Sequence, residues 1–350
     1  MSVVEAGPLA GRATAGRVRE FPERKVNGSR WFVTIGVLSL LMTAYLAIAW
    51  IVSGDATRTP TGSDPVPAAT KAWAIGWQIV GPLAFGAFAV YCWRRSRREG
   101  RLHIDALLLI AWTVAIWLDP ATTNFFRTQM LYNSYLVNFG SWAEHIPGWL
   151  SPNARFFPEP LLSWGSLYGV TSLGATLIGC ATMRLAKRRW PNMGKVGVVL
   201  SGFAAIALAD LILEVIFIRT QLYAYAGAIR SLSIWGGERH QFPVYESIIF
   251  GACWTASAAL RYFRDDRGRT IVERRINEDR LSPSKAAGLR FLAVTGFVTA
   301  IYVIYSLVFS LTTLWGDPFP KGYPSYMLNG MCGPGTGYAC EAPAIPPSHP

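Results

Sequence analysis

The chain has 350 residues, of which 51% are hydrophobic and only 15% are charged. An average soluble domain carries about 25% charge, so this composition excludes intrinsic disorder, a disulfide-rich secreted module and most soluble enzymes. The net charge of +12 would suit a nucleic-acid partner in a soluble protein. Here membrane topology explains it better, so we expect a lipid bilayer and no nucleic acid.

Seven apolar runs approach or exceed the length that crosses a bilayer core, which takes about 20 helical residues. In chain order they are 31–52, 73–93, 102–118, 161–183, 196–218, 244–260 and 291–314. The third and the sixth are short, and they carry Asp105 and Glu246 near one end. We therefore predict an all-α fold, a polytopic transmembrane helix bundle of about seven spans over residues 31–314. A disordered, basic N-terminus (1–30) should precede the bundle.

The segments between the spans differ in positive charge. Segments 1–30, 94–101, 184–195 and 261–290 together hold 25 Lys and Arg residues. Segments 53–72, 119–160, 219–243 and 315–350 together hold eight. Because positively charged loops stay in the cytoplasm, we predict a cell-membrane protein with a cytoplasmic N-terminus and an extracytoplasmic C-terminal tail (315–350).

The outer segment 119–160, between the third and fourth spans, is long and rich in aromatic and amide side chains. A loop of more than about 15 residues is usually functional or disordered, and this composition does not suit disorder. We predict a folded extracytoplasmic lid whose Asn124, Arg127 and Asn133 contact a substrate. The alternative, an aromatic belt at the membrane interface, explains these three polar residues poorly.

Acidic residues lie inside or beside several predicted spans. Asp210 and Glu214 are four residues apart in the fifth span and therefore share one helix face in its outer half. Charged groups at that depth are costly and usually face a cavity or a partner. Asp119 and Glu246, at the outer ends of two other spans, lie at the same level, so we predict that the four carboxyls line one pocket. The alternative for Asp210 and Glu214 is a structural ion pair with Arg219.

Two further residues at this face are candidate substrate contacts, Arg219 and His240 in the outer segment 219–243. A zinc site made of His145, His240 and a carboxylate is an alternative, but no ligand spacing supports it, and we predict neither a metal nor another cofactor. Asp105, near the inner membrane edge, should be dispensable for activity.

The outer tail contains two cysteines that are eight residues apart, Cys332 and Cys340. An exported pair this close is expected to form a disulfide.

Three stretches resemble the AveC-type spirocyclase family of actinobacterial integral membrane proteins. They are Leu118-Asp119-Pro120 with Asn124-Phe125, then Phe156-Phe157-Pro158-Glu159-Pro160, then the tail from Tyr323 to Thr336. The resemblance covers most of the chain. It implies a membrane protein that closes a dihydroxy ketone into a spiroketal, with an associated dehydration, and it implies no agreed set of catalytic residues.

The four acids suit that chemistry. An acid must protonate the departing hydroxyl of a hemiketal, and a base must take a proton from the attacking hydroxyl. Carboxyls close together in a low dielectric resist simultaneous ionisation, so at least one should stay protonated at neutral pH.

We therefore predict a cofactor-independent cyclase or dehydratase that acts on a lipophilic hydroxy-ketone or polyol. The alternative is a non-enzymatic lipid-binding or transport accessory protein. A transporter needs a polar path across both leaflets, and the inner halves of the spans are almost purely apolar, which favours the enzyme.

Overall fold

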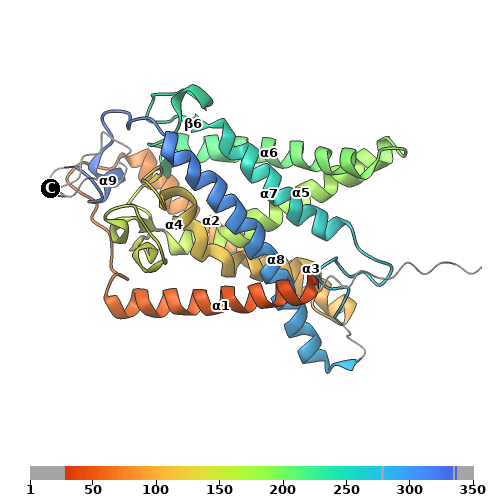
Figure 1. Ribbon diagram of the computed structural model, residues 1–350. Helices are drawn as coiled ribbons and strands as arrows, with labels where there is room; N and C mark the ends of the chain where they lie inside the picture. Colours follow the sequence, from red (N-terminus) through yellow and green to blue (C-terminus); the bar gives the residue numbers. More distant parts are fainter. Residues whose placement is uncertain (1–27, 277–279, 334–335, 337–350) are drawn as a thin grey trace, which may run out of the picture.

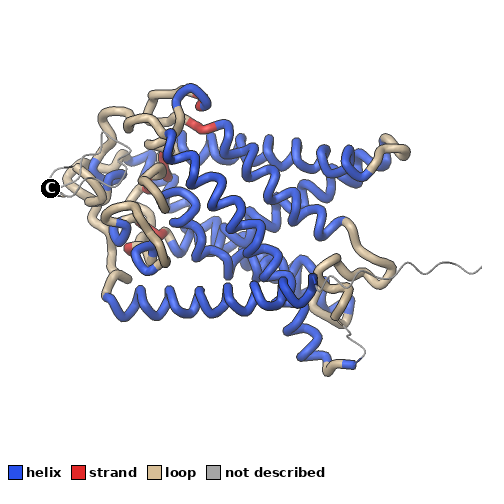
Figure 2. Tube along the Cα trace, in the orientation of Figure 1, coloured by secondary structure: helices blue, strands red, loops and turns tan. Residues whose placement is uncertain are grey.

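The computed structural model describes residues 28–276, 280–333 and 336, and its long helices form a bundle (Figure 1). Nearly all of the predicted disordered N-terminus lies outside the described residues. Helices account for most of the described chain, and the strands are short pairs at one end of the bundle (Figure 2). The long helices are α1 (Gly28–Ser53), α2 (Ala68–Glu99), α3 (Ile104–Val114), α5 (Ser166–Arg189), α6 (Lys195–Arg219), α7 (Val244–Tyr262) and α8 (Pro283–Thr312).

Among the described residues, six helical segments are long and apolar enough to cross a membrane, and each coincides with a predicted span. They are Ser29–Ser53, Ala68–Glu99, Ile104–Asn124, Ser166–Arg189, Lys195–Arg219 and Pro283–Trp315. The seventh helix, α7, coincides with the remaining predicted span and packs against α5, α6 and α8. It buries three polar side chains, Glu246, Thr255 and Arg261. That α7 crosses the membrane stays a prediction.

The third membrane-length helix extends further than the sequence suggested. The predicted span ended at Leu118, but the chain continues through a 3-10 turn, η1 (Ala115–Leu118), into α4 (Asp119–Asn124). Pro120 lies in the first turn of α4, where a missing N–H leaves no helical hydrogen bond unmade. Asp119 and Asn124 therefore belong to a buried helix and not to the loop that follows it.

A folded cap covers one end of the bundle, and it is built from three segments where the sequence predicted one lid. We define the cap as residues 125–160, 220–243 and 316–333 (left in Figure 1). Strand β1 (Leu131–Tyr132) pairs antiparallel with β4 (Tyr223–Ala224), which joins the first segment to the second. The third segment, which carries α9 (Ser325–Leu328), joins them because Asn329 Nδ2 donates to the Tyr132 carbonyl over 2.8 Å.

Smaller elements complete the cap and its edges. Two more antiparallel pairs are β2 (Phe139–Gly140) with β3 (Pro158–Glu159) and β5 (Ser233–Ile234) with β6 (Phe242–Pro243). Short 3-10 turns are η2 (Ala143–His145), η3 (Ala154–Phe156), η5 (Arg230–Leu232) and η7 (Thr313–Trp315), and a π-helical turn, η4 (Leu161–Gly165), precedes α5.

The tail cysteines are only partly covered by the structure. Cys332 is disulfide-bonded, and the other described cysteines, Cys92, Cys180 and Cys253, are free thiols. Cys340, the predicted partner of Cys332, lies outside the described residues.

The first and the last long helices pack against each other at two glycines. A Cβ atom placed on Gly36 of α1 would overlap the Leu292 backbone, and one on Gly296 of α8 would overlap the Phe32 backbone. Small residues permit such close helix contacts where the surrounding medium is itself apolar. The remaining faces of α1 are largely exposed, and α1 lies along one side of the bundle (Figure 1).

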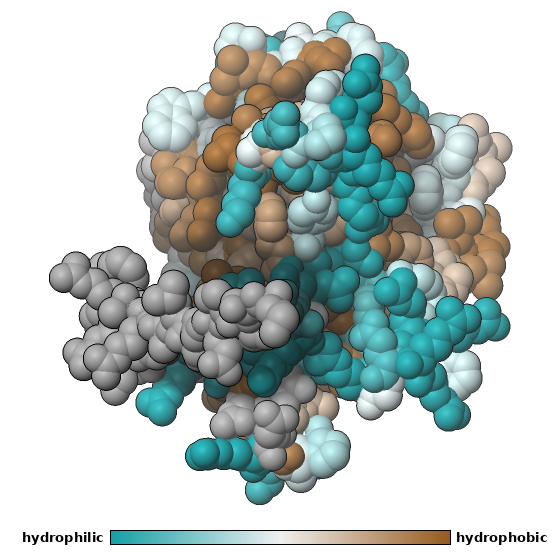
Figure 3. All heavy atoms as spheres, turned by 90° about the vertical axis from the view of Figure 1, so that its right-hand side faces the viewer, coloured by the Kyte–Doolittle hydropathy of each residue, from teal (hydrophilic) through white to brown (hydrophobic). Residues whose placement is uncertain are grey.

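The end of the bundle opposite the cap carries the basic helix ends. Helix α2 finishes with Arg97 and Arg98, and α5 finishes with Lys187, Arg188 and Arg189. Figure 3 looks onto this end, where hydrophilic side chains gather in front of a largely hydrophobic body. This separation of charge along the bundle axis is the one that the loop composition predicted.

Candidate active site

A cavity beneath the cap brings together the four acids that the sequence singled out. Asp119 of α4, Asp210 and Glu214 of α6 and Glu246 of α7 all line it. Its empty volume is about 690 Å³, the open space at its mouth included. Asp119, Asp210 and Glu246 are each less than a tenth exposed. The geometry thus places three helices so that their carboxyls face one hollow, while the catalytic role of those carboxyls stays a prediction.

Glu214 is held by two tyrosines of the cap. The Tyr223 hydroxyl donates to Oε1 over 2.6 Å, and the Tyr225 hydroxyl donates to Oε2 over 2.7 Å. Alternate residues of an extended strand point the same way, and the pairing of β4 with β1 fixes that direction. Burial, with the nearby Glu214 as the next cause, raises the pKa of both phenols well above the usual range. Both tyrosines therefore keep their protons and act as hydrogen-bond donors.

The other three acids differ in their hydrogen bonds, and in the part of the chain that the structure describes two of them keep an unpaired oxygen. Ser247 Oγ donates to Asp210 Oδ2 over 2.8 Å, and the Tyr305 hydroxyl donates to Glu246 Oε1 over 2.6 Å. Within residues 28–276 and 280–333, Glu246 Oε2 and Asp119 Oδ2 are buried and accept no hydrogen bond. Buried polar atoms are normally paired, so two unpaired carboxyl oxygens beside one cavity indicate a place for a hydroxyl or a carbonyl of a ligand.

A fifth buried carboxyl, that of Glu159, interacts electrostatically with Asp119. Glu159 is 1% exposed and accepts a hydrogen bond from Ser141 Oγ over 3.0 Å. Burial, and then the neighbouring Asp119 carboxyl, raise the pKa of Glu159 well above its usual range. Tyr132, which lines the cavity and hydrogen-bonds to Asp119, also has a pKa raised well above the usual range, mainly by burial. The sequence named Glu159 only within a family stretch and did not identify Tyr132 as a site residue.

Aromatic rings form much of the remaining cavity wall. Phe250 and Trp254, one turn apart on α7, stack with ring centroids 3.9 Å apart. Trp254 also stacks on Trp112 of α3, at 4.6 Å, and Tyr168 hydrogen-bonds to Tyr302 deeper in the bundle. None of the residues lining this cavity is basic. The cavity is therefore acidic and aromatic, a setting that attracts positive charge.

The three lid residues expected to contact a substrate lie outside the lining of this cavity. Asn124 Oδ1 accepts hydrogen bonds from two backbone N–H groups of the following turn, at 2.8 and 3.0 Å. Asn133 Nδ2 donates to the Gln221 carbonyl over 2.9 Å. Both amides hold the cap in shape, next to the strands that carry the site tyrosines. Arg127 is buried, with Nε lacking a hydrogen-bond partner in the described part of the chain.

The other two predicted contacts, Arg219 and His240, line a separate pocket on the outer side of the cap. The Arg219 guanidinium lies over the Trp235 ring, 4.2 Å from its centroid, and burial together with Arg219 lowers the pKa of His240. Across the described residues no ion pair joins Arg219 to Asp210 or Glu214, so the structural pair considered for those acids is not formed. The outer pocket adjoins the acidic cavity, because Tyr223 lines both.

The two histidines considered for zinc lie in different surroundings. His145 Nε2 is 3.1 Å from Asp55 Oδ2, whereas His240 packs beside Trp235. In the ranges that the structure describes, no three or more His, Cys, Asp or Glu side chains are grouped so that they could hold a metal ion.

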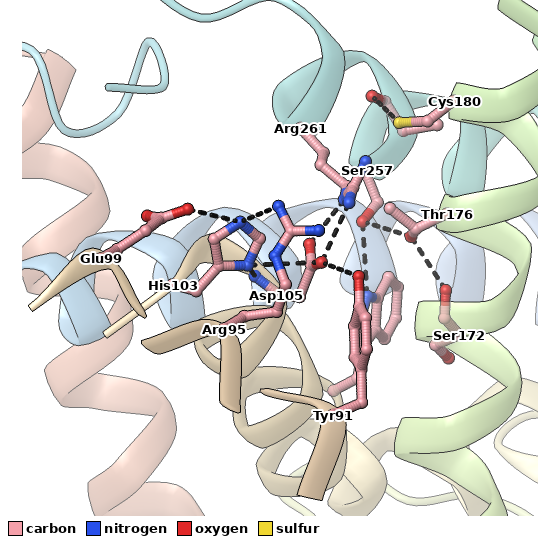
Figure 4. A network of polar contacts seen from close by, with 12 residues as sticks. Tyr91, Arg95, Glu99, His103, Asp105, Ser172, Thr176, Cys180, Ser257 and Arg261 are labelled. Atoms are coloured by element: carbon pink, nitrogen blue, oxygen red, sulfur yellow. Dashed lines mark hydrogen bonds and ion pairs between the residues drawn. The ribbon is translucent and has the colours of Figure 1, made fainter. Parts of the chain in front are cut away.

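A second buried polar network lies at the basic end of the bundle (Figure 4). Arg261 of α7 binds both carboxylate oxygens of Asp105, at 2.5 and 2.9 Å. The Tyr91 hydroxyl donates to the same carboxylate over 2.9 Å, and His103 caps α3 by accepting from the Asp105 N–H. Asp105 is thus fully paired and ties α2, α3 and α7 together. Asp105 therefore has a structural role. The sequence predicted only that it is dispensable for activity.

Fold and cavity together define a class: a helical bundle compatible with a membrane protein, holding a buried cluster of carboxyls under a folded cap. The family model of AveC-like spirocyclases matches residues 97–327, more than half of the chain, and the chain belongs to this family. The matched range contains all four cavity acids and leaves α1 and nearly all of α2 outside. No curated protein and no solved structure matches the chain.

Proposed function

We propose that the protein is a membrane-embedded, cofactor-independent cyclase or dehydratase that uses its cavity carboxyls on a lipophilic hydroxy-ketone or polyol. One observation carries the proposal: Asp119, Asp210, Glu214 and Glu246 line a single buried cavity in which tyrosine hydroxyls are the partners of three of them. Membership of the spirocyclase family supports a cyclisation. Such a cyclisation needs an acid and a base, and several carboxyls in one cavity provide both.

The proposed roles follow from the hydrogen bonds. Glu214 accepts on both oxygens, as an ionised carboxylate does, and it is the proposed base. Glu246 accepts on Oε1 only, so Oε2 can carry a proton and present it to the substrate, which makes Glu246 the proposed acid. Asp119 and Asp210 are proposed to share protons with this pair, since these acids interact with one another electrostatically.

The reaction balances without an oxidant or a reductant. One substrate hydroxyl adds to the ketone and forms a hemiketal. The protonated carboxyl then gives its proton to the hemiketal hydroxyl, and the C–O bond breaks. A water molecule departs, and an oxocarbenium ion remains. The second hydroxyl attacks this carbon while the ionised carboxylate takes its proton, so that one dihydroxy ketone yields one spiroketal and one water.

The walls of the cavity support the charged intermediate. An oxocarbenium ion is cationic, and it would lie among carboxyls and the faces of Trp254, Phe250 and Tyr305. The cap limits access of bulk water, which would otherwise capture the ion before the second hydroxyl does. Loss of water without a second attack would use the same acid and base, and this is why dehydration is part of the proposal.

The proposal includes an orientation, with the basic end of the bundle in the cytoplasm and the cap outside. Single cysteines at Glu144 and Ser231, both exposed on the cap, should react with a membrane-impermeant maleimide on intact cells. A cysteine at Lys195, exposed at the opposite end, should react only after the cells are opened. The background should keep the Cys332 disulfide and lack the free thiols. Labelling of Lys195→Cys on intact cells would reverse the orientation.

Deletion of the gene, followed by complementation, tests the proposed activity. The deletion strain should accumulate a lipophilic hydroxy-ketone that is heavier than the missing product by one water, because ring closure releases water. The wild-type gene should restore the product. An unchanged set of lipophilic metabolites, together with altered membrane lipid transport, would favour the non-enzymatic alternative.

A further inference from the structure

Beside the acidic cavity lies a second hollow, a groove between α5 and α6, helices that pack against each other along one side of the bundle (Figure 1). Thr171, Asp210, Leu213 and Phe250 line both spaces, so the two spaces adjoin along these side chains. The groove has an empty volume of about 900 Å³ and the cavity about 690 Å³, open space included in both. The larger space therefore lies beside the carboxyls and not among them.

The groove is apolar and opens on the outer surface of the bundle. Thr171 and Asp210 are the only polar residues in its lining, and both lie on the boundary with the acidic cavity. Ile178, Ile212 and Ile216, which line the rest of it, are 43%, 53% and 41% exposed. These isoleucines belong to helices of membrane length, so the groove faces the region that lipid chains occupy in a bilayer. Polarity thus changes between the two adjoining spaces, from apolar side chains at the bundle surface to carboxyls inside.

From this polarity gradient we infer the class of substrate and its route. The groove between α5 and α6 holds the hydrocarbon chain of an amphipathic molecule whose hydroxyl and ketone groups lie in the acidic cavity. The substrate enters from the bilayer through this groove, so the cap does not have to open. This inference rests on the proposed function, because it assigns the cavity to the reacting end of the same molecule.

One glycine allows the groove to be filled without disturbing the fold. A Cβ atom at Gly174, in the middle of α5, would meet no heavy atom within 4 Å. Leucine there should project into the groove, and it favours a helix more than glycine does. Gly86 on α2 is an exposed helical glycine with equally open surroundings outside the groove. Gly86→Leu is therefore the matched control for Gly174→Leu.

The test uses photolabelling of the purified full-length protein in lipid nanodiscs. One probe is a long-chain dihydroxy ketone with a diazirine near the end of its alkyl chain, and the second is the same chain without the polar head. The headed probe should label peptides of α5 and α6 in preference to the headless one. Gly174→Leu should lower that labelling by about tenfold, a loss of about 1.4 kcal/mol in binding, while Gly86→Leu should leave it unchanged.

Turnover of long-chain and short-chain dihydroxy ketones separates this inference from the proposed function. Gly174→Leu should raise KM for the long-chain compound and leave the short-chain compound unaffected. If the wild-type protein converts neither compound but the headed probe still labels α5 and α6 selectively, the proposed function fails and the groove stands as a binding site. Equal labelling by the two probes would mean that the groove holds bilayer lipid only. That result, or unchanged labelling and KM in Gly174→Leu, would overturn the inference.

Discussion

Replacing Glu214 by Gln is expected to lower turnover by about 100-fold or more, the usual scale of general acid–base catalysis. Gln keeps the size of the side chain and can still accept one phenolic hydrogen bond, but it cannot take a proton from the attacking hydroxyl. Glu246→Gln and Asp210→Asn should show losses on the same scale, because each removes a titratable group from the cavity. Product formation in membranes from a complemented deletion strain measures the effect.

Two controls separate loss of chemistry from loss of fold. Asp266→Asn changes a carboxyl that is exposed at the basic end of the bundle, and it should keep wild-type turnover. Each cavity variant should also elute as a single species in detergent and melt close to the wild type. Full turnover by all three cavity variants would remove these carboxyls from the reaction.

Removing one partner of the Asp105–Arg261 pair is expected to destabilise the protein by about 3–5 kcal/mol. Asp105 is 0% exposed and Arg261 is 6% exposed, so Arg261→Gln leaves a carboxylate uncompensated inside the bundle. Unfolding in mixed detergent micelles measures the change. Asp105→Asn should behave similarly, and its loss of activity would follow the loss of folded protein.

A double substitution distinguishes a paired charge from simple loss of packing. Asp105→Leu with Arg261→Met removes both charges and replaces them with apolar groups, so it should be much less destabilising than the two single changes added together. Arg264→Gln, an exposed arginine nearby in sequence, should have little effect. Wild-type unfolding of Arg261→Gln would show that the pair contributes nothing to stability.

The sequence was most informative where an apolar run or a charge determined the structure alone. Six predicted spans coincide with membrane-length helices, because a run of about 20 apolar residues has few other options. Asp210 and Glu214 could be assigned to one helix face from their spacing. Asp119 and Glu246 could be assigned to the same level because both begin or end a span at the outer side.

What the sequence could not show depends on contacts between distant segments. Tyr223 and Tyr225 reach Glu214 because β4 pairs with β1, and no local pattern predicts that pairing. Tyr305 could have been suspected as a polar ring within the last span, but its partner on α7 could not. The tail joins the cap through a long-range hydrogen bond of Asn329, which leaves no local pattern in the sequence. The sequence therefore predicted a lid made of one segment.

The first and last long helices pack against each other at Gly36 and Gly296, so this contact can form only after α8 has been synthesised. Chains grow at about 5–20 residues per second, so α1 is made well before α8. During that interval the glycine face of α1 lacks the helix that covers it in the folded protein. A chain that stops before α8 never forms this contact. The contact between α1 and α8 therefore forms only in chains that contain both ends of the bundle.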